Sequence, residues 1–439
     1  MIDRFFALFD AVAARLRGDE SLRLSLAGED SDFVRFNEGR VRQAGAVSHH
    51  RVTMALRGGS PAREAAATFP AGGEADAETA AALLGALRER LAVLPGDPLL
   101  PPAPAPSATE DHGPPLDFAP ADAVAALCGR VAGEDAVGAW ASGRQVRAVA
   151  DSGGTRRAWS RHSWSLDLSL VAEDERAARV SLRGGPFDAR ALDAALDASR
   201  ARRAALQAPL VPVGPGPVRA WLAPAAVADL LALIGPGFGA GAVRAGTSAL
   251  HGLHQGTQAF DPAVCWEEAP ARLGAPPFSA EGHARPAVVP LVVAGRPAGV
   301  LVPARAGVEH GLPGTGTDED ALPVGLSMAA GALDDGDLPR LVGDGLLIHH
   351  LWYLNWSGRA QGRFTGLTRA AAFVVRGGRV VGPAPVLRVD DTLEQVFGAG
   401  FLGAGRTAVV LPRTDTYLGR SVRAVEAPGV LVEGLRVVG

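Results

Sequence analysis

Hydrophobic and polar residues follow two different periods along the first half of the chain, and together they predict units built of helices and strands. In residues 1–95, helical spacing of the apolar side chains predicts an amphipathic opening helix with Phe5, Leu8, Phe9, Val12 and Leu16 on one face. Asp3 is placed to cap it. Two-residue alternation then predicts strands, and helical spacing returns in a closing helix; the ranges are 22–27, 33–37, 51–56 and 65–69 for the strands and 76–93 for the helix.

A second unit repeats this order in residues 116–208. Helices are expected at both ends and strands between them, with the helices over 120–132 and 187–206 and the strands over 138–150, 158–172 and 179–182. The same succession in both units predicts an internal structural repeat. Residues 96–115 between the units are rich in proline and lack periodicity, which predicts an extended linker.

Residues 218–439 contain more glycine and more short apolar runs, and they predict a β-rich C-terminal domain with a few helices. Within 343–385, the pattern predicts a strand at 346–353, a polar crossing at 355–366 and a strand at 371–376. Gly377-Gly378 then predicts a hairpin turn. Further elements are a helix at 225–234 and strands at 218–222, 287–293, 299–302, 408–411 and 430–438. The predicted fold class is α+β: two N-terminal α/β repeat-like units followed by a β-rich C-terminal domain.

The composition is that of a globular protein and excludes several functions. Of 439 residues 47% are apolar, and the net charge of −4 argues against a nucleic-acid partner. All 43 basic residues are arginine, because the chain contains no lysine, so lysine Schiff-base chemistry is excluded. Cys128 and Cys265 stand in no metal-ligand spacing. No apolar run approaches the roughly 18 residues of a membrane span, and the first residues lack a signal-peptide pattern. We therefore expect a cytoplasmic protein with no membrane partner.

Two stretches carry a family resemblance. Residues 352–383, WYLNWSGRAQGRFTGLTRAAAFVVRGGRVVGP, resemble the C-terminal core of the TldD/PmbA family. Residues 31–59, SDFVRFNEGRVRQAGAVSHHRVTMALRGG, resemble the first domain of the same family. That family pairs a zinc-peptidase subunit of the TldD type with a metal-free sister subunit, called TldE or PmbA. The resemblance implies a TldD/PmbA-type fold.

The resemblance favours the metal-free branch. TldD-type subunits carry HExxxH on the helix after the first strand of the last domain, and a later cysteine. The matching helix here, AAVADLLALIGPGFGAGAV, contains no His and no Glu, and the segment TDTYLGRSVRAVEAPGVLVEGL contains no Cys. The resemblance thus implies a non-catalytic TldE/PmbA-like subunit of a heteromeric zinc metallopeptidase, without a cofactor of its own. A TldD-like partner subunit would hold the zinc, and unfolded or modified peptides would enter a shared cavity as an added strand.

Two histidine pairs are alternatives for a metal site in this chain. His251 and His254 stand three residues apart, but flanking glycines predict a loop without a carboxylate, which favours ordinary surface or core histidines. His349 and His350 lie in the predicted strand, so their side chains point to opposite faces and do not chelate one ion together. For one of these two, facing a cavity and packing in the core are equal alternatives.

The stretch that carries the resemblance also concentrates aromatic and basic side chains. Core packing, a subunit interface and a peptide-binding wall all fit its tryptophan and tyrosine content. Its arginines are expected either to bind a substrate carboxylate or to pair with acids such as Asp390 or Asp391. The candidate peptide-binding or interface residues are His349, His350, Trp352, Tyr353, Asn355, Trp356, Arg359, Arg363, Thr365 and Arg369.

Two other functions fit the sequence. The first is a diverged TldE-like enzyme that uses residues 349–356 for chemistry of its own in a biosynthetic pathway. The second is a binding protein that acts alone as a homodimer. Activity of the isolated chain distinguishes the first from a metallopeptidase subunit, and independence from a sister subunit is expected of the second.

Overall fold

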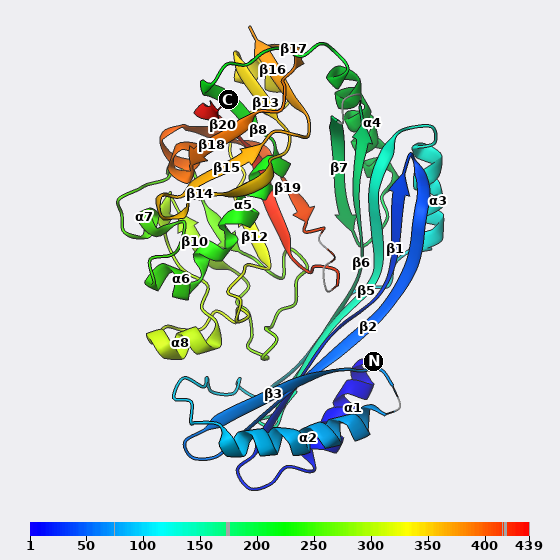
Figure 1. Cartoon of the computed structure of the whole chain (residues 1–439), viewed down its shortest axis with the longest axis vertical. Coiled ribbons are helices and arrows are strands. Elements are labelled where there is room, and N and C mark those ends of the chain that lie inside the picture. The colour runs from blue at the N-terminus through cyan, green and yellow to red at the C-terminus, as the bar shows by residue number, and fades with distance from the viewer. Residues whose placement is uncertain (74, 173–175, 415, 417–418, 439) are drawn as a thin grey trace.

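Seven long strands form one curved sheet, and a β-rich domain lies against one side of it (Figure 1). The computed structural model describes residues 1–73, 75–172, 176–414, 416 and 419–438. Helices and strands are both abundant, and the expected α+β class is confirmed.

Both N-terminal segments contribute strands to the same sheet. Its order is β3-β2-β1-β5-β6-β4, and β7 pairs with the other half of the β6 edge. The first segment gives β1 Ser21–Asn37, β2 Arg40–Gly58 and β3 Arg63–Pro70; residues 107–184 give β4 Ser107–His112, β5 Ala136–Asp151, β6 Thr155–Val171 and β7 Ala177–Gly184. Antiparallel pairing of β1 with β5 joins the two segments.

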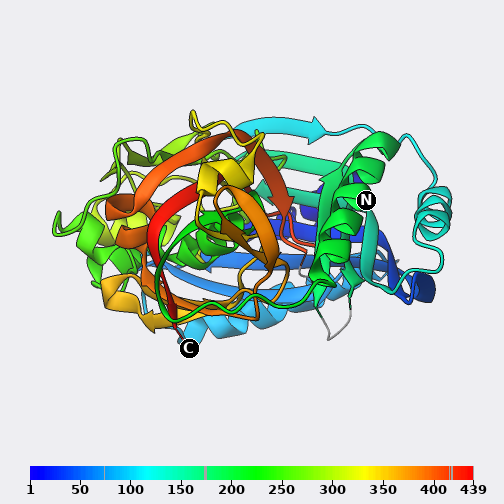
Figure 2. The same cartoon turned by 90° about the horizontal axis from the view of Figure 1, so that it is seen from above.

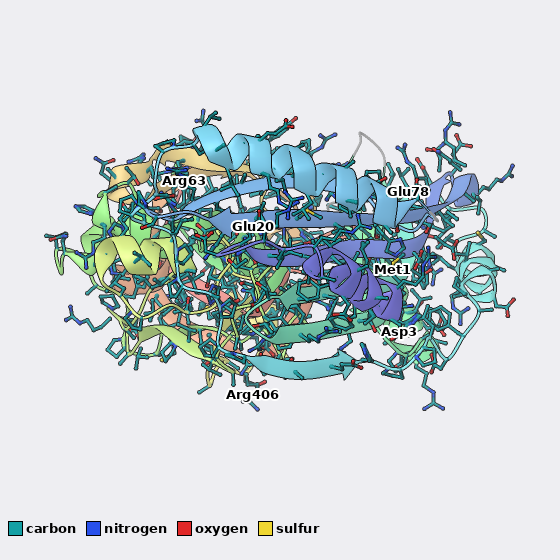
Figure 3. The ribbon with its side chains drawn as sticks, turned by 90° about the horizontal axis from the view of Figure 1, so that it is seen from below. Met1, Asp3, Glu20, Arg63, Glu78 and Arg406 are labelled. Carbon is teal, nitrogen blue, oxygen red and sulfur yellow. The ribbon has the colours of Figure 1, made fainter. Side chains whose placement is uncertain are left out.

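Four helices cover one face of this sheet. They are α1 Ile2–Ala13, α2 Asp76–Val93, α3 Pro120–Arg130 and α4 Ala189–Leu206. Seen from below, α1 and α2 lie side by side across the strands (Figure 3). Leu24, Met54 and Leu84 meet in the core between α1, α2 and the sheet, and a second core lies under α3 and α4 around the stacked rings of Trp140 and Trp164. From two directions, α3 lies at the end farthest from the C-terminal domain (Figures 1 and 2).

The C-terminal domain is built on a 13-stranded mixed sheet whose central strands are β20, β8 and β13. Its strands are β8 Gly216–Leu222, β9 Trp266–Glu268, β10 Val289–Val293, β11 Arg296–Pro297, β12 Gly325–Met328, β13 Gly345–Ile348, β14 Trp352–Gly358, β15 Arg363–Leu367, β16 Ala372–Arg376, β17 Arg379–Pro383, β18 Arg388–Thr392, β19 Phe401–Pro412 and β20 Ala424–Val438. Its helices are α5 Pro224–Ile234, α6 Ala240–Arg244, α7 His251–His254, α8 Ala304–His310 and α9 Leu338–Val342, with short turns of helix at Gly235–Phe238, Arg359–Gln361 and Gln395–Ala399. The apolar helix α5 packs into the main core.

Several sequence predictions are confirmed, and several were wrong. The helix at 76–93 and the hairpin at Gly377-Gly378 are present, the two glycines having φ of 52° and 73°. The two strands expected at 22–27 and 33–37 are one strand, β1, and the predicted linker contains β4. The prediction that Asp3 caps the first helix was wrong. Asp3 lies inside the first turn of α1, and no side chain caps this helix. Among the described residues, 299–302 form no strand.

The expected strand at 346–353 is also wrong. It is interrupted at residues 349–351, because β13 pairs with β16 while β14 turns away to pair with β15. The expected polar crossing at 355–366 is the β14–β15 hairpin. His349 and His350 therefore lie between two strands, and the argument that a strand separates their side chains does not apply.

Candidate functional site

A row of neighbouring cavities lies between the curved sheet and the C-terminal domain. Three of them have volumes of about 500, 570 and 740 Å³. The first two share Gln145 and Arg420 in their walls, and the second and third share Ser165 and Thr414. We call this row of three cavities the cleft and take it as the candidate site, because ligands bind in concave sites between structural layers.

The cleft side of the sheet is polar because side chains alternate between the two faces of a strand. Even-numbered residues such as Leu24 and Val146 lie under the helices, and odd-numbered residues such as Arg147, Asp167 and Arg179 face the cleft. A polar face of this kind normally meets solvent. Here the C-terminal domain covers it, so its charges are partly removed from water.

At the β6–β7 end of the cleft, one aspartate holds groups from both layers. Asp167 accepts hydrogen bonds from Arg179 Nε at 2.6 Å and from Arg179 Nη2 at 2.5 Å. The same carboxylate accepts a hydrogen bond from Thr414 Oγ1 at 3.1 Å, in the segment that leads from β19 to β20. Asp167 therefore ties the sheet to the C-terminal domain across the cleft.

The environment of this pair keeps both partners charged. Burial opposes the charge of Asp167, but the Arg179 guanidinium more than offsets this effect and lowers the pKa of Asp167. Burial also opposes the charge of Arg179, while Asp167 and then Asp229 raise the pKa of Arg179. Breaking this ion pair would leave one charge unpaired in a site that is largely removed from solvent.

Two histidines lie beside this pair. His350 Nδ1 is 3.6 Å from Asp229 Oδ2 on α5, and Asp229 also accepts a hydrogen bond from the main-chain N–H of Leu351 at 3.3 Å. The ring of His349 lies 6.0 Å from that of Phe373, edge to face. Burial, with Arg202 and His350 nearby, lowers the pKa of His349 to about 3, so His349 is neutral at pH 7.

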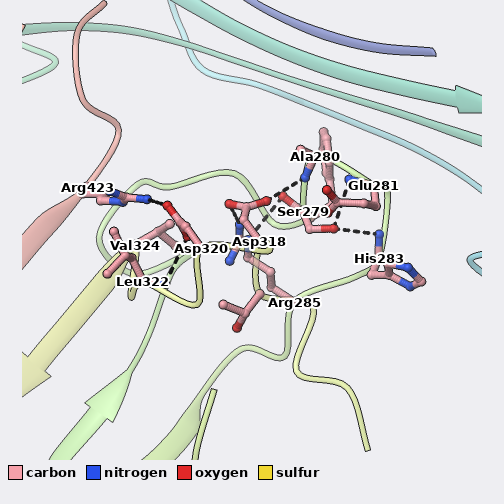
Figure 4. A network of polar contacts seen from close by, with 12 residues as sticks. Ser279, Ala280, Glu281, His283, Arg285, Asp318, Asp320, Leu322, Val324 and Arg423 are labelled. Carbon is pink, nitrogen blue, oxygen red and sulfur yellow. Dashed lines mark hydrogen bonds and ion pairs between the residues drawn. The ribbon is translucent and has the colours of Figure 1, made fainter. Parts of the chain in front are cut away.

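Loops of the C-terminal domain form the wall at the other end of the cleft (Figure 4). Asp318 accepts hydrogen bonds from Arg285 Nη2 at 2.6 Å and from the main-chain N–H of Ala280 at 2.8 Å. A second ion pair joins Arg423 to Asp320. These contacts fix the loops to the segment that precedes β20.

Arg420 divides this wall from the middle of the cleft. Its side chain donates to Ser163 O at 2.9 Å and to Gly143 O at 3.2 Å, and its main-chain N–H donates to both oxygens of Glu29 at 3.2 Å. Burial lowers the pKa of Arg420 to about 10. It therefore remains positively charged at neutral pH and clamps the C-terminal segment onto the sheet.

Three of the ten candidate residues, His350, Trp352 and Arg369, line the cleft. His349 lines a smaller neighbouring cavity of about 210 Å³ together with His350. Arg369 lies over the ring of Trp352, 4.4 Å from its centroid, and the Trp352 and Tyr353 rings are 4.0 Å apart. Tyr353 is 69% exposed and Trp352 is 39% exposed. Core packing therefore does not explain this aromatic pair.

The other predicted residues belong to the β14–β15 hairpin and to ordinary structure. Arg363 pairs with Asp390 at 2.6 Å, the alternative expected for these arginines. Thr365 Oγ1 donates to Val389 O at 3.1 Å, and Trp356 packs against the main core. Asn355 Oδ1 accepts the main-chain N–H of Trp356 at 2.8 Å, and Arg359 is exposed.

The histidines considered as alternative metal ligands do not gather with other such ligands in the described part of the chain. His251 and His254 lie on the short helix α7, where a loop was expected, and burial together with His251 lowers the pKa of His254. Over the described ranges, no three His, Cys, Asp or Glu side chains gather closely enough to hold an ion. On α5, the only side chain among His, Cys, Asp and Glu is Asp229. Zinc does not fit this donor set.

The sequence prediction missed the arginines of the curved sheet that line the cleft, among them Arg51, Arg147, Arg179 and Arg183. The available signal was weak, because polar and charged residues occupy only some of the alternate positions of the predicted strands. That pattern identified a polar face without showing that another layer covers it.

Solved structures match this fold over the whole chain. TldE from Thermococcus kodakarensis has a TM-score of 0.77 at 15% identity, covering 100% of this chain and 99% of that chain. A protein from Thermotoga maritima, described as a candidate modulator of DNA gyrase, gives 0.76 at 14% identity and covers 99% of both chains. A protein from Bacteroides thetaiotaomicron with a similar description gives 0.73 at 14% identity, covering 99% of this chain and 98% of that chain.

The chain therefore has the fold of the TldD/PmbA proteins, as the sequence resemblance implied. Identities of 14–15% establish the fold alone. No protein-family model and no curated protein matches the chain. Within the described part of the chain, no helix has the length and apolar character needed to cross a membrane.

Proposed function

We propose that this protein is a non-catalytic, TldE-like subunit that joins a TldD-like zinc metallopeptidase in the proteolysis of unfolded or modified peptides. The observation that carries the proposal is the full-length likeness to TldE, with a TM-score of 0.77. It is supported by the donor set of α5, where Asp229 is the one side chain of a metal-ligating type.

The division of labour follows from these residues. A peptidase zinc needs three protein ligands and an open position for water. This chain lacks the first requirement within its described residues, so the zinc, its water and the general base belong to the partner subunit. The contribution of this chain is the wall of a peptide cavity and the surface that holds the partner.

Trp352, Tyr353 and Arg369 are the residues we assign to the partner contact. Exposed Trp, Tyr and Arg side chains are enriched at the centres of protein interfaces. Tyr353 is the more exposed of the aromatic pair, and its ring packs against Trp352, which lines the cleft. A partner that covers this aromatic pair would also close the cleft against solvent.

The test is native mass spectrometry of the chain alone and co-expressed with a TldD-like protein from the same organism, with zinc measured in each sample. We expect a mixed complex that holds about one zinc per pair and cleaves an unfolded peptide, while the isolated chain does neither. Trp352→Ala combined with Tyr353→Ala should weaken the complex. Val93→Ala, which truncates an 82% exposed side chain at the end of α2, is the matched control.

Three results would refute the proposal. Stoichiometric zinc on the isolated chain would reveal a site of its own, to be sought first at His251, His254, His349 and His350. Peptide turnover by the isolated chain would make it an enzyme in its own right. A stable homodimer that ignores the TldD-like protein would make it an independent binding protein.

A further inference from the structure

The cavity of about 500 Å³ at the Arg51 end of the cleft has an excess of positive charge that no described carboxylate neutralises. Five arginines line it, against two acids, Glu29 and Asp318. The five are Arg51, Arg147, Arg285, Arg420 and Arg423.

Both acids are already engaged by other groups. Asp318 accepts from Arg285 at 2.6 Å and from the main-chain N–H of Ala280. Glu29 accepts from the main-chain N–H of Arg420 at 3.2 Å and from Ser31 Oγ at 3.0 Å. Arg423 is paired with Asp320. Arg420 has no ion pair, but its side chain donates hydrogen bonds to Ser163 O and Gly143 O. Among the described residues, Arg51 and Arg147 are the two remaining arginines of the cavity, and no carboxylate lies in ion-pair contact with either.

The register of the sheet places these two arginines on either side of one small residue. Ala27 of β1 lies directly opposite Arg51 of β2 and directly opposite Arg147 of β5. The three residues therefore form a row on one face, with the two arginine Cα atoms about 10 Å apart at two strand spacings. The small side chain of Ala27 lines the cavity together with the two arginines.

The hydrogen bonds of the pair point to an absent acceptor. Arg147 Nη1 donates to Val146 O at 2.8 Å and to Gly28 O at 3.4 Å, which holds the side chain in place. Across the described residues, neither Arg51 nor Arg147 forms an ion pair, and the Arg51 side chain forms no hydrogen bond. Burial lowers the pKa of Arg147. The charges of Asp318 and Glu29 raise this pKa, and the charge of Arg51 lowers it further. An anion between the two would relieve that cost.

We propose that Arg51 and Arg147 form a carboxylate-binding subsite above Ala27, which selects peptide segments carrying an acidic group at that position. This inference rests on the proposed function in taking a peptide as the ligand. The size of the cavity supports that choice over a small free anion, because about 500 Å³ is far more space than one inorganic anion fills. A peptide anchored at the pair has room in the cavity for the residues that flank its acidic group.

The test uses the full chain, alone and in complex with its TldD-like partner, and measures fluorescence anisotropy of labelled heptapeptides. The first peptide has one central Glu and blocked ends, the second has Gln in its place, and the third has Gln and a free C-terminal carboxylate. We expect the Glu peptide to bind roughly 10-fold to 100-fold tighter than the blocked Gln peptide at low salt, since a charge-assisted hydrogen bond contributes that much. The third peptide shows whether a terminal carboxylate serves equally.

Variants test the residues themselves. Arg51→Met and Arg147→Met should each abolish most of the preference for Glu, and Arg51→Lys should retain part of it because the charge remains without the planar fork. Arg340→Met, at a side chain that is 84% exposed, is the control. Ala27→Glu should occupy the subsite internally, raise the melting temperature relative to Ala27→Gln and block the Glu peptide. This last pair of variants tests the site even if an arginine variant folds poorly.

Equal affinity for the Glu and Gln peptides in both samples would overturn the inference. Displacement by millimolar inorganic phosphate without any preference for Glu would overturn it as well, and would assign the pair to phosphate. The two proposals fail separately. Acid-selective binding by a chain that forms no TldD-like complex refutes only the proposed function, and a zinc-containing complex that cleaves both peptides equally refutes only the subsite.

Discussion

The ion pair between Asp167 and Arg179 should contribute more to stability than a surface pair of the same geometry. The perturbation is Asp167→Asn, which removes the charge that faces two guanidinium nitrogens at 2.6 and 2.5 Å and the hydroxyl of Thr414 at 3.1 Å. Asp193 and Arg130 form the matched pair on the helix surface, with a similar contact at 2.5 Å between α4 and α3.

The magnitude follows from how far the pair is removed from water. Leaving one partner of a fully buried pair alone costs about 3–5 kcal/mol. Asp167 and Arg179 keep 25% and 31% of their side-chain exposure, so we discount this to about 2–3 kcal/mol for Asp167→Asn. Asp193 is half exposed, and Asp193→Asn should change stability very little.

The assay is equilibrium urea denaturation of both variants, followed by tryptophan fluorescence at several pH values. The folded state lowers the pKa of Asp167, so its stabilisation is complete above the unfolded value of about 3.9 and is lost as the pH falls below it. The difference between wild type and Asp167→Asn should therefore be constant from pH 7 to pH 5 and shrink in more acidic buffer. A loss at pH 7 no larger than that of Asp193→Asn would refute the reasoning.

Two further predictions concern buried positions. His349 has its pKa lowered to about 3 by burial, so protonation of the unfolded chain destabilises the wild type as the pH falls from about 6.5 towards 3. His349→Gln should lose less stability over that window in melting experiments, and parallel curves would contradict the assignment. A Cβ at Gly429 would lie 2.1 Å from Cζ2 of the buried Trp221, so Gly429→Ala should cost about 1–3 kcal/mol in denaturant. Gly241→Ala, which meets no atom within 4 Å, is its control, and equal stability of the two variants would argue against the clash.

The sequence alone determined the elements whose pattern is local and strong. Helix α2 has the predicted bounds because apolar side chains recur every three or four residues along its 18 residues and leave one face to bury. The hairpin at Gly377-Gly378 was predictable because two successive residues with positive φ are tolerated best by glycine. The family resemblance implied the TldD/PmbA-type fold before any coordinates were compared.

The tertiary structure decided which elements share a sheet and what covers each face. Strand β4 forms in a proline-rich segment because β6 offers it a parallel edge, and such an edge cannot be recognised from local sequence. Residues 349–351 interrupt the run that was expected to be one strand, because β13 and β14 pair with different strands.

The candidate site, too, was only partly predictable from the sequence. Alternation along the strands is consistent with Arg51, Arg147 and Arg179 lying on the face opposite the helices, but the sequence prediction did not single them out. The sequence could not show that the C-terminal domain closes over that face, because a period of two residues is the same whether the polar side meets water or another layer. Burial beneath the C-terminal domain shifts the pKa values of these charged groups and strengthens their interactions. This burial arises only when the two parts of the chain come together.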